Sequence, residues 1–195
     1  MDTLVIGADD RKPMNFQSKF LSFPESDLVV AGTGHAGFIN GWFECLSSFS
    51  GTEYIDKLNI IAPEIFQESV NTAGDLGEVT ATIYHFGYSK AEARYVGYAY
   101  RSTAGFQSEP LPYDCFGVKP EVSVELPENI EFPSLLVDLI LKQQNQDQML
   151  PIEQQVGIGG EIEFVVLANR SIHIETVHRF ATYERELQYI ESRGA

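Results

Sequence analysis

The side chains that could act as nucleophiles are few in this sequence. A cysteine nucleophile needs a thiolate, which a partnered histidine usually supports. Cys45 lies in the apolar stretch GFINGWFECLSSF, so we interpret it as a buried small hydrophobic residue, and Cys115 follows an acidic residue in PYDCFG. Neither has the C-x-x-C spacing of a metal site. The four histidines are scattered: His35, His85, His173 and His178. The sequence therefore pairs no histidine with a cysteine, and we expect no metal and no cofactor.

Composition and charge exclude several classes of protein. The 195 residues suffice for one domain with a substantial core, and 44% hydrophobic with 21% charged residues is typical of a globular protein. The formal net charge is −15. A surface this acidic repels phosphate backbones, so we expect no nucleic-acid partner. No apolar run is long enough to span a membrane and no signal peptide is visible, so we expect a cytoplasmic protein with no membrane contact.

Hydrophobic periodicity predicts the elements that must position any functional residue. Alternating or continuous apolar residues predict strands in the first part of the chain, over 2–8, 16–23 and 27–34. Helical spacing then predicts a helix within 34–51, stopped by Gly51, and a helical region within 54–74 that is interrupted at Pro63.

The second half of the chain reads as hairpins and helices. Residues 79–103 predict a tyrosine-rich hairpin, and the prolines of 106–120 leave room for only a short strand. A helix is expected over 132–148 with Ser134 near its cap. A second hairpin follows over 159–180, with its turn at Asn169-Arg170, and a polar helix over 182–194. The GIGG segment at 157–160 precedes a strand rather than a helix, which indicates a turn and not a dinucleotide site.

This order of elements predicts an α+β fold. Hairpins dominate, so the sheets should be mainly antiparallel, and helices come before and after the strands. We expect a single domain, 1–195, built as a four-layer α/β/β/α sandwich with two mainly antiparallel sheets between helical layers.

Two stretches of the chain resemble a known family. DTLVIGADDRKPMNFQSKFLSFPESDLVVAGTG, residues 2–34, is similar to the early part of proteasome β-type and HslV-type subunits, which are N-terminal-nucleophile hydrolases. In that family an acidic residue is followed by a lysine in an alternating strand, then by an apolar strand that ends in Ala-Gly. VGIGGEIEFVVLANRSIHIETVHRF, residues 156–180, resembles the late Gly-Gly hairpin of the same family.

The resemblance implies roles for three residues. Family members attack an amide carbonyl with an N-terminal hydroxyl or thiol, and the free α-amine serves as base. Asp2 would be the carboxylate that positions a lysine, and Lys19 the lysine that lowers neighbouring pKa values. Gly32 would be the glycine whose N–H holds the oxyanion.

The sequence also departs from the family pattern. Family members begin with a strand whose first residue is the nucleophile, and we expect that strand to be absent from this sequence. Thr3 could supply a hydroxyl, but it does not stand at a free amine. An Asp and a Ser often precede the late Gly-Gly of active members, and Gln155 and Ile158 stand there instead.

Three functions remain open. The first is a proteasome-like, catalytically inactive assembly or binding module. The second is a threonine-type peptidase or amidase whose N-terminus lies upstream of Met1. The third is an unrelated α+β binding domain that uses a tyrosine face on the hairpin, although such residues more often pack across strands. These tyrosines are Tyr84, Tyr88, Tyr95, Tyr98 and Tyr100.

We also predict partners for the chain. Family members assemble into rings, and an exposed sheet edge invites pairing with another chain, so self-association is expected. A peptide substrate would follow from the second function.

Overall fold

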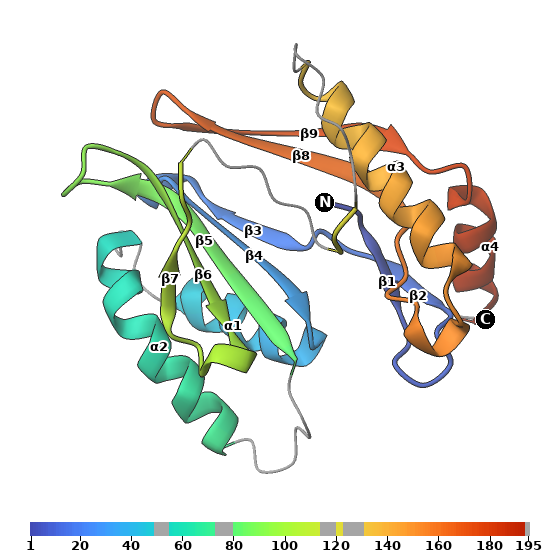
Figure 1. Cartoon of the computed structure of the whole chain (residues 1–195), viewed down its shortest axis with the longest axis horizontal. Helices are drawn as coiled ribbons and strands as arrows, with labels where there is room; N and C mark the ends of the chain where they lie inside the picture. The colour runs from blue at the N-terminus through green and yellow to red at the C-terminus, as the bar shows by residue number, and fades with distance from the viewer. Residues whose placement is uncertain (49–54, 73–79, 114–119, 123–130, 194–195) are drawn as a thin grey trace. The chain divides into compact units, whose positions relative to one another are not determined.

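Figure 1 shows a computed structural model of the chain, which describes residues 1–48, 55–72, 80–113, 120–122 and 131–193. The described residues form an α+β fold of four α-helices and three sheets, so the predicted class is confirmed. They divide into two compact units, each built from separate stretches of chain. We call Phe20–Asp114 with Val166–His173 the five-stranded unit, and Met1–Lys19, Cys115–Val165 and Ile174–Ala195 the hairpin unit. The single domain and the order of its layers stay predictions.

The number of sheets differs from the two that were expected. One continuous strand was predicted over 16–23, but only residues 20–23 of it form a strand of their own; Phe16 instead ends a strand that begins at Pro13, outside the predicted range. The strand over 13–16 pairs with residues 4–6, and the strand over 20–23 pairs with residues 28–31. Because these two strands have different partners, the described strands form three hydrogen-bonded sheets.

The five-stranded unit is an antiparallel sheet with helices α1 and α2 on one face (Figure 1). Its strand order is β3-β4-β5-β6-β7. The strands are β3 (Phe20–Phe23), β4 (Leu28–Gly34), β5 (Ala81–Ser89), β6 (Arg94–Arg101) and β7 (Ser108–Pro110), and the helices are α1 (Ala36–Ser48) and α2 (Ile55–Thr72). The predicted tyrosine-rich hairpin is therefore confirmed as β5 and β6, and β7, which ends at Pro110, is the short strand expected within 106–120.

Helix α2 continues through Pro63, where an interruption was predicted. Proline in a helix removes one backbone hydrogen bond and costs about 3 kcal/mol. The helix nevertheless buries one continuous face, because Leu58, Ala62 and Phe66 follow helical spacing on either side of Pro63 and are at most 1% exposed. Burial of that face offsets the lost bond, since each large apolar side chain contributes roughly 1.5–3 kcal/mol.

The core of the five-stranded unit is aromatic and contains one buried histidine. Trp42 of α1 donates its indole N–H to Nε2 of His85 on β5 at 3.0 Å. His85 is fully buried, and its ring also lies against Tyr100 of β6 and Phe66 of α2. Tyr100 is buried here too, so this hairpin tyrosine is a packing residue. Nδ1 of His85 finds no hydrogen-bond partner among the described residues.

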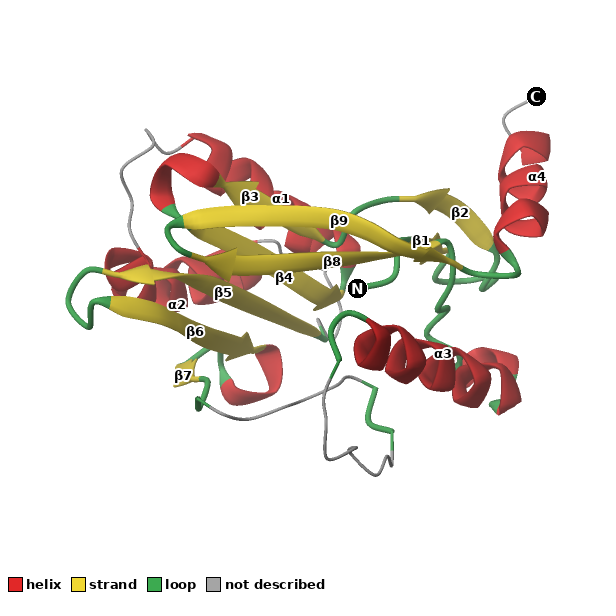
Figure 2. Ribbon diagram, turned by 90° about the horizontal axis from the view of Figure 1, so that it is seen from above, coloured by secondary structure: helices red, strands yellow, loops and turns green. Residues whose placement is uncertain are grey.

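The hairpin unit contains one whole hairpin, two helices and the base of a second hairpin, whose tip (residues 166–173) belongs to the five-stranded unit. Figure 2 shows the longer hairpin, formed by β8 and β9. The strands are β1 (Leu4–Ile6), β2 (Pro13–Phe16), β8 (Glu161–Ala168) and β9 (Ser171–Arg179), and the helices are α3 (Ser134–Met149) and α4 (Tyr183–Arg193). The turn between β8 and β9 is at Asn169 and Arg170 as predicted, and both have positive φ.

The core of the hairpin unit is smaller than that of the five-stranded unit. Ile158, Ile162 and Phe180 form its buried centre, and Val137 and Ile140 of α3 pack against it. Ser134 was expected near the cap of α3; it is the first helical residue, and Pro133 holds the cap position without a side-chain hydrogen bond. No described helix is long and apolar enough to cross a membrane.

Acid should weaken the fold through His85. Burial lowers the pKa of His85 to about 3, whereas an unfolded histidine titrates near about 6.5. Between these values the unfolded chain binds a proton that the folded chain does not, so stability is present above pH 6.5 and is lost as the pH falls towards 3. The slope should approach roughly 1 kcal/mol per pH unit.

The matched variant is His85→Gln, whose amide oxygen can accept the Trp42 N–H but does not titrate. Urea unfolding between pH 7 and 4 should show a shallower loss of stability for the variant than for the wild type. Equal slopes would show that His85 is not the group responsible.

Candidate functional site

Asp2 and Lys19 lie together in the hairpin unit, as the resemblance implied. Nζ of Lys19 donates to Oδ2 of Asp2 at 2.7 Å. The β1–β2 hairpin brings them together: Leu4 pairs with Phe16, and the N–H of Gln17 donates to the carbonyl of Thr3 at 2.8 Å. The pairing thus carries the chain back beside its own start, which places Lys19 next to Asp2.

The ion pair between Asp2 and Lys19 is partly buried but remains accessible to solvent. The Asp2 side chain is 15% exposed and that of Lys19 is 25% exposed. Oδ2 of Asp2 also accepts the N–H of Gly159 at 3.4 Å, and Asp2 forms an antiparallel bridge with Ile162 of β8. An ammonium held in this way can stabilise negative charge or lower the pKa of an adjacent nucleophile. Such chemistry is what the resemblance implied for Lys19.

The amino group of Met1 lies in the same surroundings. It donates to the carbonyl oxygen of Glu163 at 2.6 Å, and the N–H of Glu163 donates back to the Met1 carbonyl at 2.8 Å. Burial lowers the pKa of the Met1 amino group; Asp2 and Glu163 oppose this shift, and Lys19 adds to it. The surroundings of Lys19 therefore disfavour a second positive charge.

The backbone beside the ion pair is held by side chains. Oδ1 and Oδ2 of Asp147 accept the N–H groups of Val156 and Gly157 at 2.8 and 3.0 Å. A carboxylate oxygen of Glu186 accepts the N–H of Gly160 at 3.0 Å. Together with the bond from Gly159 to Asp2, three carboxylates fix this segment, which we call the glycine loop (residues 156–161).

The glycine loop needs its glycines. Gly157 and Gly160 have φ of +75° and +76°, a region that L side chains rarely adopt. A Cβ at Gly160 would lie 2.4 Å from Oγ1 of Thr3. The GIGG segment was predicted to be a turn, and it is an irregular segment that leads directly into β8.

The hydroxyl of Thr3 is occupied. Thr3 is 6% exposed, and its Oγ1 accepts the N–H of Glu161 at 2.8 Å. Its backbone N–H donates to the carbonyl of Gly159 at 3.3 Å. Thr3 therefore closes the glycine loop through both its side chain and its backbone.

The two positions that depart from the family pattern have structural roles. The amide nitrogen of Gln155 donates to the carbonyl of Leu150 at 2.9 Å. Ile158 belongs to the buried centre with Ile162 and Phe180. Its carbonyl accepts the side-chain amide of Gln144 at 2.9 Å. Neither side chain contributes a hydroxyl or a carboxylate to the ion pair.

Gly32 belongs to the five-stranded unit, whereas Asp2 and Lys19 belong to the hairpin unit. It lies in β4 and pairs with Ile83 of β5. A Cβ at Gly32 would lie 2.7 Å from Ile39 of α1, so close packing of the helix on the strand already requires a glycine. Its role in holding an oxyanion stays a prediction.

The cysteines and histidines form no catalytic group among the described residues. Cys45 is half-buried in α1, no histidine in the described part of the chain hydrogen-bonds to it, and burial raises the pKa of its thiol. Cys115 lies outside the described residues. His35 accepts the N–H of Phe38 at 3.1 Å near the start of α1. The described residues also contain no group of three or more potential metal ligands.

Sequence reasoning missed the side chains that hold the glycine loop. Gln144 and Asp147 lie in KQQNQDQ, which reads as a solvated helix end, and Glu186 lies in a helix expected to be polar. All three are under 9% exposed. The available signal was the spacing of three between Gln144 and Asp147, which places both on one face of α3.

Comparison with known proteins adds no relative. A scan against models of protein families found no match to this chain, and a search of curated proteins found none either. The likeness to N-terminal-nucleophile hydrolases therefore rests on the sequence motifs, and the contact between Asp2 and Lys19 is compatible with it.

Removing the Asp147 carboxylate should loosen the glycine loop. Asp147→Ala leaves the N–H groups of Val156 and Gly157 without their acceptor and should lower the free energy of unfolding by about 2–3 kcal/mol. Asp147→Asn keeps one acceptor oxygen and should lose less. Urea denaturation measures both, with Gln146→Ala on the exposed side of the same helix as control. A loss for Asp147→Ala no larger than the control's would contradict this role.

Proposed function

We propose that this chain is a proteasome-like protein with the fold of the N-terminal-nucleophile hydrolases, and that it acts as a non-catalytic assembly or binding module in the cytoplasm. The observation that carries the proposal is the Asp2–Lys19 ion pair at 2.7 Å, beside a Thr3 hydroxyl that is buried and already bonded. The pair supports an inherited pocket. The occupied hydroxyl, with Gln155 and Ile158 turned to structural contacts, supports binding rather than cleavage.

A second candidate is a threonine-type peptidase or amidase whose nucleophile is supplied by residues that precede Met1. The same ion pair favours it, because Lys19 is held in place and is still 25% exposed on its side chain. A fixed ammonium at this position would lower the pKa of an incoming α-amine or hydroxyl. The two candidates differ in whether a nucleophile reaches the pair.

The third function considered, a binding domain with a tyrosine face, has less support. Tyr100 is buried, and Tyr98 packs against the core of the five-stranded unit. Tyr88 and Tyr95 contact each other edge to face across the hairpin, with ring centroids 5.4 Å apart. These tyrosines are engaged in packing within the chain, as cross-strand pairs usually are.

An amidase assay separates the first two candidates. Protein isolated from its natural source is incubated with fluorogenic peptide amides, and its N-terminal residue is read by sequencing and intact mass. For a binding module we expect no release of the fluorophore above the level of a Lys19→Ala variant. Turnover that Lys19→Ala abolishes and the exposed control Lys142→Ala preserves would overturn the first candidate. A threonine, serine or cysteine at the N-terminus would then support the second.

Self-association is a further part of the proposal, and the edge of β9 supports it. In the described part of the chain β9 pairs only with β8, and most of its nine residues are exposed. Unpaired strand edges bind other chains. Light scattering after size exclusion should give a multiple of 21.8 kDa, and Ile174→Lys at the 43% exposed Ile174 should shift the mass towards that of one chain, whereas Ile174→Val should not. A wild-type mass of 21.8 kDa would contradict self-association.

A further inference from the structure

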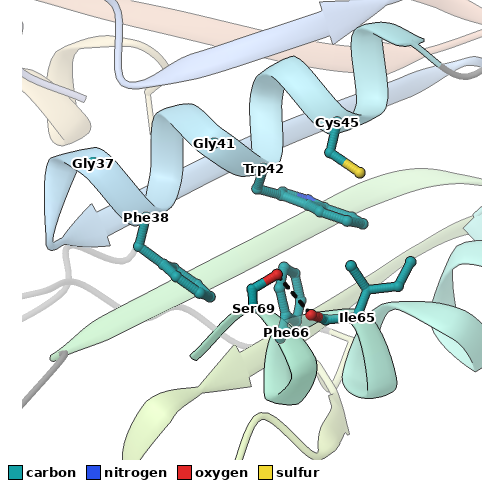
Figure 3. A pocket seen from close by; sticks show the side chains of 8 residues that line it. All are labelled: Gly37, Phe38, Gly41, Trp42, Cys45, Ile65, Phe66 and Ser69. Carbon is teal, nitrogen blue, oxygen red and sulfur yellow. Dashed lines mark hydrogen bonds between the residues drawn. The ribbon is translucent and has the colours of Figure 1, made fainter. Parts of the chain in front are cut away.

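A pocket of about 320 Å³ lies between helices α1 and α2 of the five-stranded unit. Figure 3 shows Phe38, Trp42 and Cys45 projecting from α1 towards Ile65 and Phe66 of α2. The remaining lining residues are Gly37, Gly41 and Ser69. This volume is at the lower end of the range for small-molecule sites, which are usually apolar and aromatic. The pocket shares no residue with the Asp2–Lys19 pair and is not used by the function proposed above.

The pocket has an aromatic floor and an open mouth. Phe38, Trp42 and Phe66 are buried, with exposed fractions of 8%, 4% and 1%. Gly41 and Ser69, by contrast, are exposed. The exposed residues Gly41 and Ser69 therefore mark the mouth of the pocket, and the buried rings mark its floor.

The fold does not require a glycine at position 41, and the absence of a side chain there leaves the mouth of the pocket open. It lies inside α1, where glycine is less favourable than alanine by about 1 kcal/mol. Its φ is not positive, and a Cβ built on it would meet no atom within 4 Å. Neither backbone conformation nor packing therefore requires a glycine here. The missing side chain leaves the wall of the pocket uncovered.

The residues that line the pocket can make mainly apolar contacts with a ligand. The hydroxyl of Ser69 already donates to the carbonyl of Ile65 at 2.8 Å. The Cys45 thiol is neutral near pH 7, because burial raises its pKa above the ordinary value. No lining side chain carries a charge, so the body of a ligand should be an aromatic or aliphatic group.

Charged residues near the mouth of the pocket determine which charge the outer end of a ligand should carry. Glu44 is exposed three residues after Gly41 on α1, and Glu68 is exposed three residues after Ile65 on α2. Residues three apart are neighbours on a helix surface, so a carboxylate lies beside the pocket on each helix. The chain as a whole carries a net charge of −15. Both the local and the total charge attract a cation and repel an anion.

We propose that the pocket between α1 and α2 binds a small organic cation with an apolar body, an aryl- or alkylammonium compound. The apolar body of the ligand packs against the aromatic floor formed by Trp42, Phe38 and Phe66. The ammonium stays at the mouth, between the helices that carry Glu44 and Glu68.

Trp42 allows a direct test, because it is the single tryptophan of the chain. The full chain is titrated with 4-phenylbutylammonium and, separately, with 4-phenylbutyrate, which has the same body and the opposite charge. We expect a saturable change in tryptophan fluorescence with the cation and at least tenfold weaker binding of the anion. No saturable change, or equal affinity for the two probes, would overturn the proposal.

Variants locate the binding. Gly41→Leu fills the mouth at a site where an added Cβ meets no atom within 4 Å, and it should weaken binding of the cation at least tenfold. Ser47→Leu adds the same side chain at an exposed position of α1 outside the pocket and should bind as the wild type does. Ser69→Leu blocks the opposite wall and replaces Gly41→Leu if that variant does not fold. Wild-type affinity in a folded, blocked variant would refute the site.

Cys45 provides a second readout that does not depend on fluorescence. In a Cys115→Ser background Cys45 is the one remaining cysteine, and its reaction with N-ethylmaleimide can be followed by intact mass. Saturating 4-phenylbutylammonium should slow this reaction several-fold, because Cys45 lines the pocket. An unchanged rate at a concentration that saturates the fluorescence change would place the binding elsewhere and overturn the proposal.

Discussion

The backbone N–H groups of the glycine loop need hydrogen-bond acceptors, most of all at the buried residues 158–160, and the hairpin unit is organised around that requirement. Buried N–H groups that lack a partner are strongly unfavourable, and this loop has no strand partner to supply one. Asp147 from α3, Glu186 from α4 and Asp2, which precedes β1, supply the acceptors instead. One loop thus connects both helices of the unit to its first hairpin. Asp2 also forms the ion pair with Lys19, so the candidate site is part of the same hydrogen-bond network as the glycine loop.

Much of the fold could be predicted from the sequence because its signals are local. Alternation in β5 and β6, helical spacing in α1, and the Asn169-Arg170 turn each follow from a few neighbouring residues. Two predictions failed where tertiary packing decided the outcome. Pro63 does not interrupt α2, since the buried face on both sides of it stays in register. The strand expected over 16–23 is shorter, because Phe16 ends β2 and pairs with β1, whereas residues 20–23 pair with β4.

The candidate site was predictable only in part. The contact of Asp2 with Lys19 was anticipated from a resemblance, and it forms because the two residues flank the β1–β2 hairpin. Asp147 and Glu186 were not anticipated, since a carboxylate that binds backbone N–H groups looks in sequence like any charged residue on a helix. Glu186 is buried against a loop that is distant from it in the chain. Hydrophobic periodicity reports only on neighbouring residues, so it could not predict this contact.

The separation of partners along the chain has a consequence for folding. Asp2 accepts a hydrogen bond from Gly159, 157 residues away, whereas β3 to β7 and helices α1 and α2 all lie within 20–114. Contacts between distant residues form late, because the loop between them must first be closed. During synthesis the five-stranded sheet can therefore assemble while the β1–β2 hairpin still lacks its partners. The surroundings of Lys19 are completed only after α3, the glycine loop and Glu186 have left the ribosome.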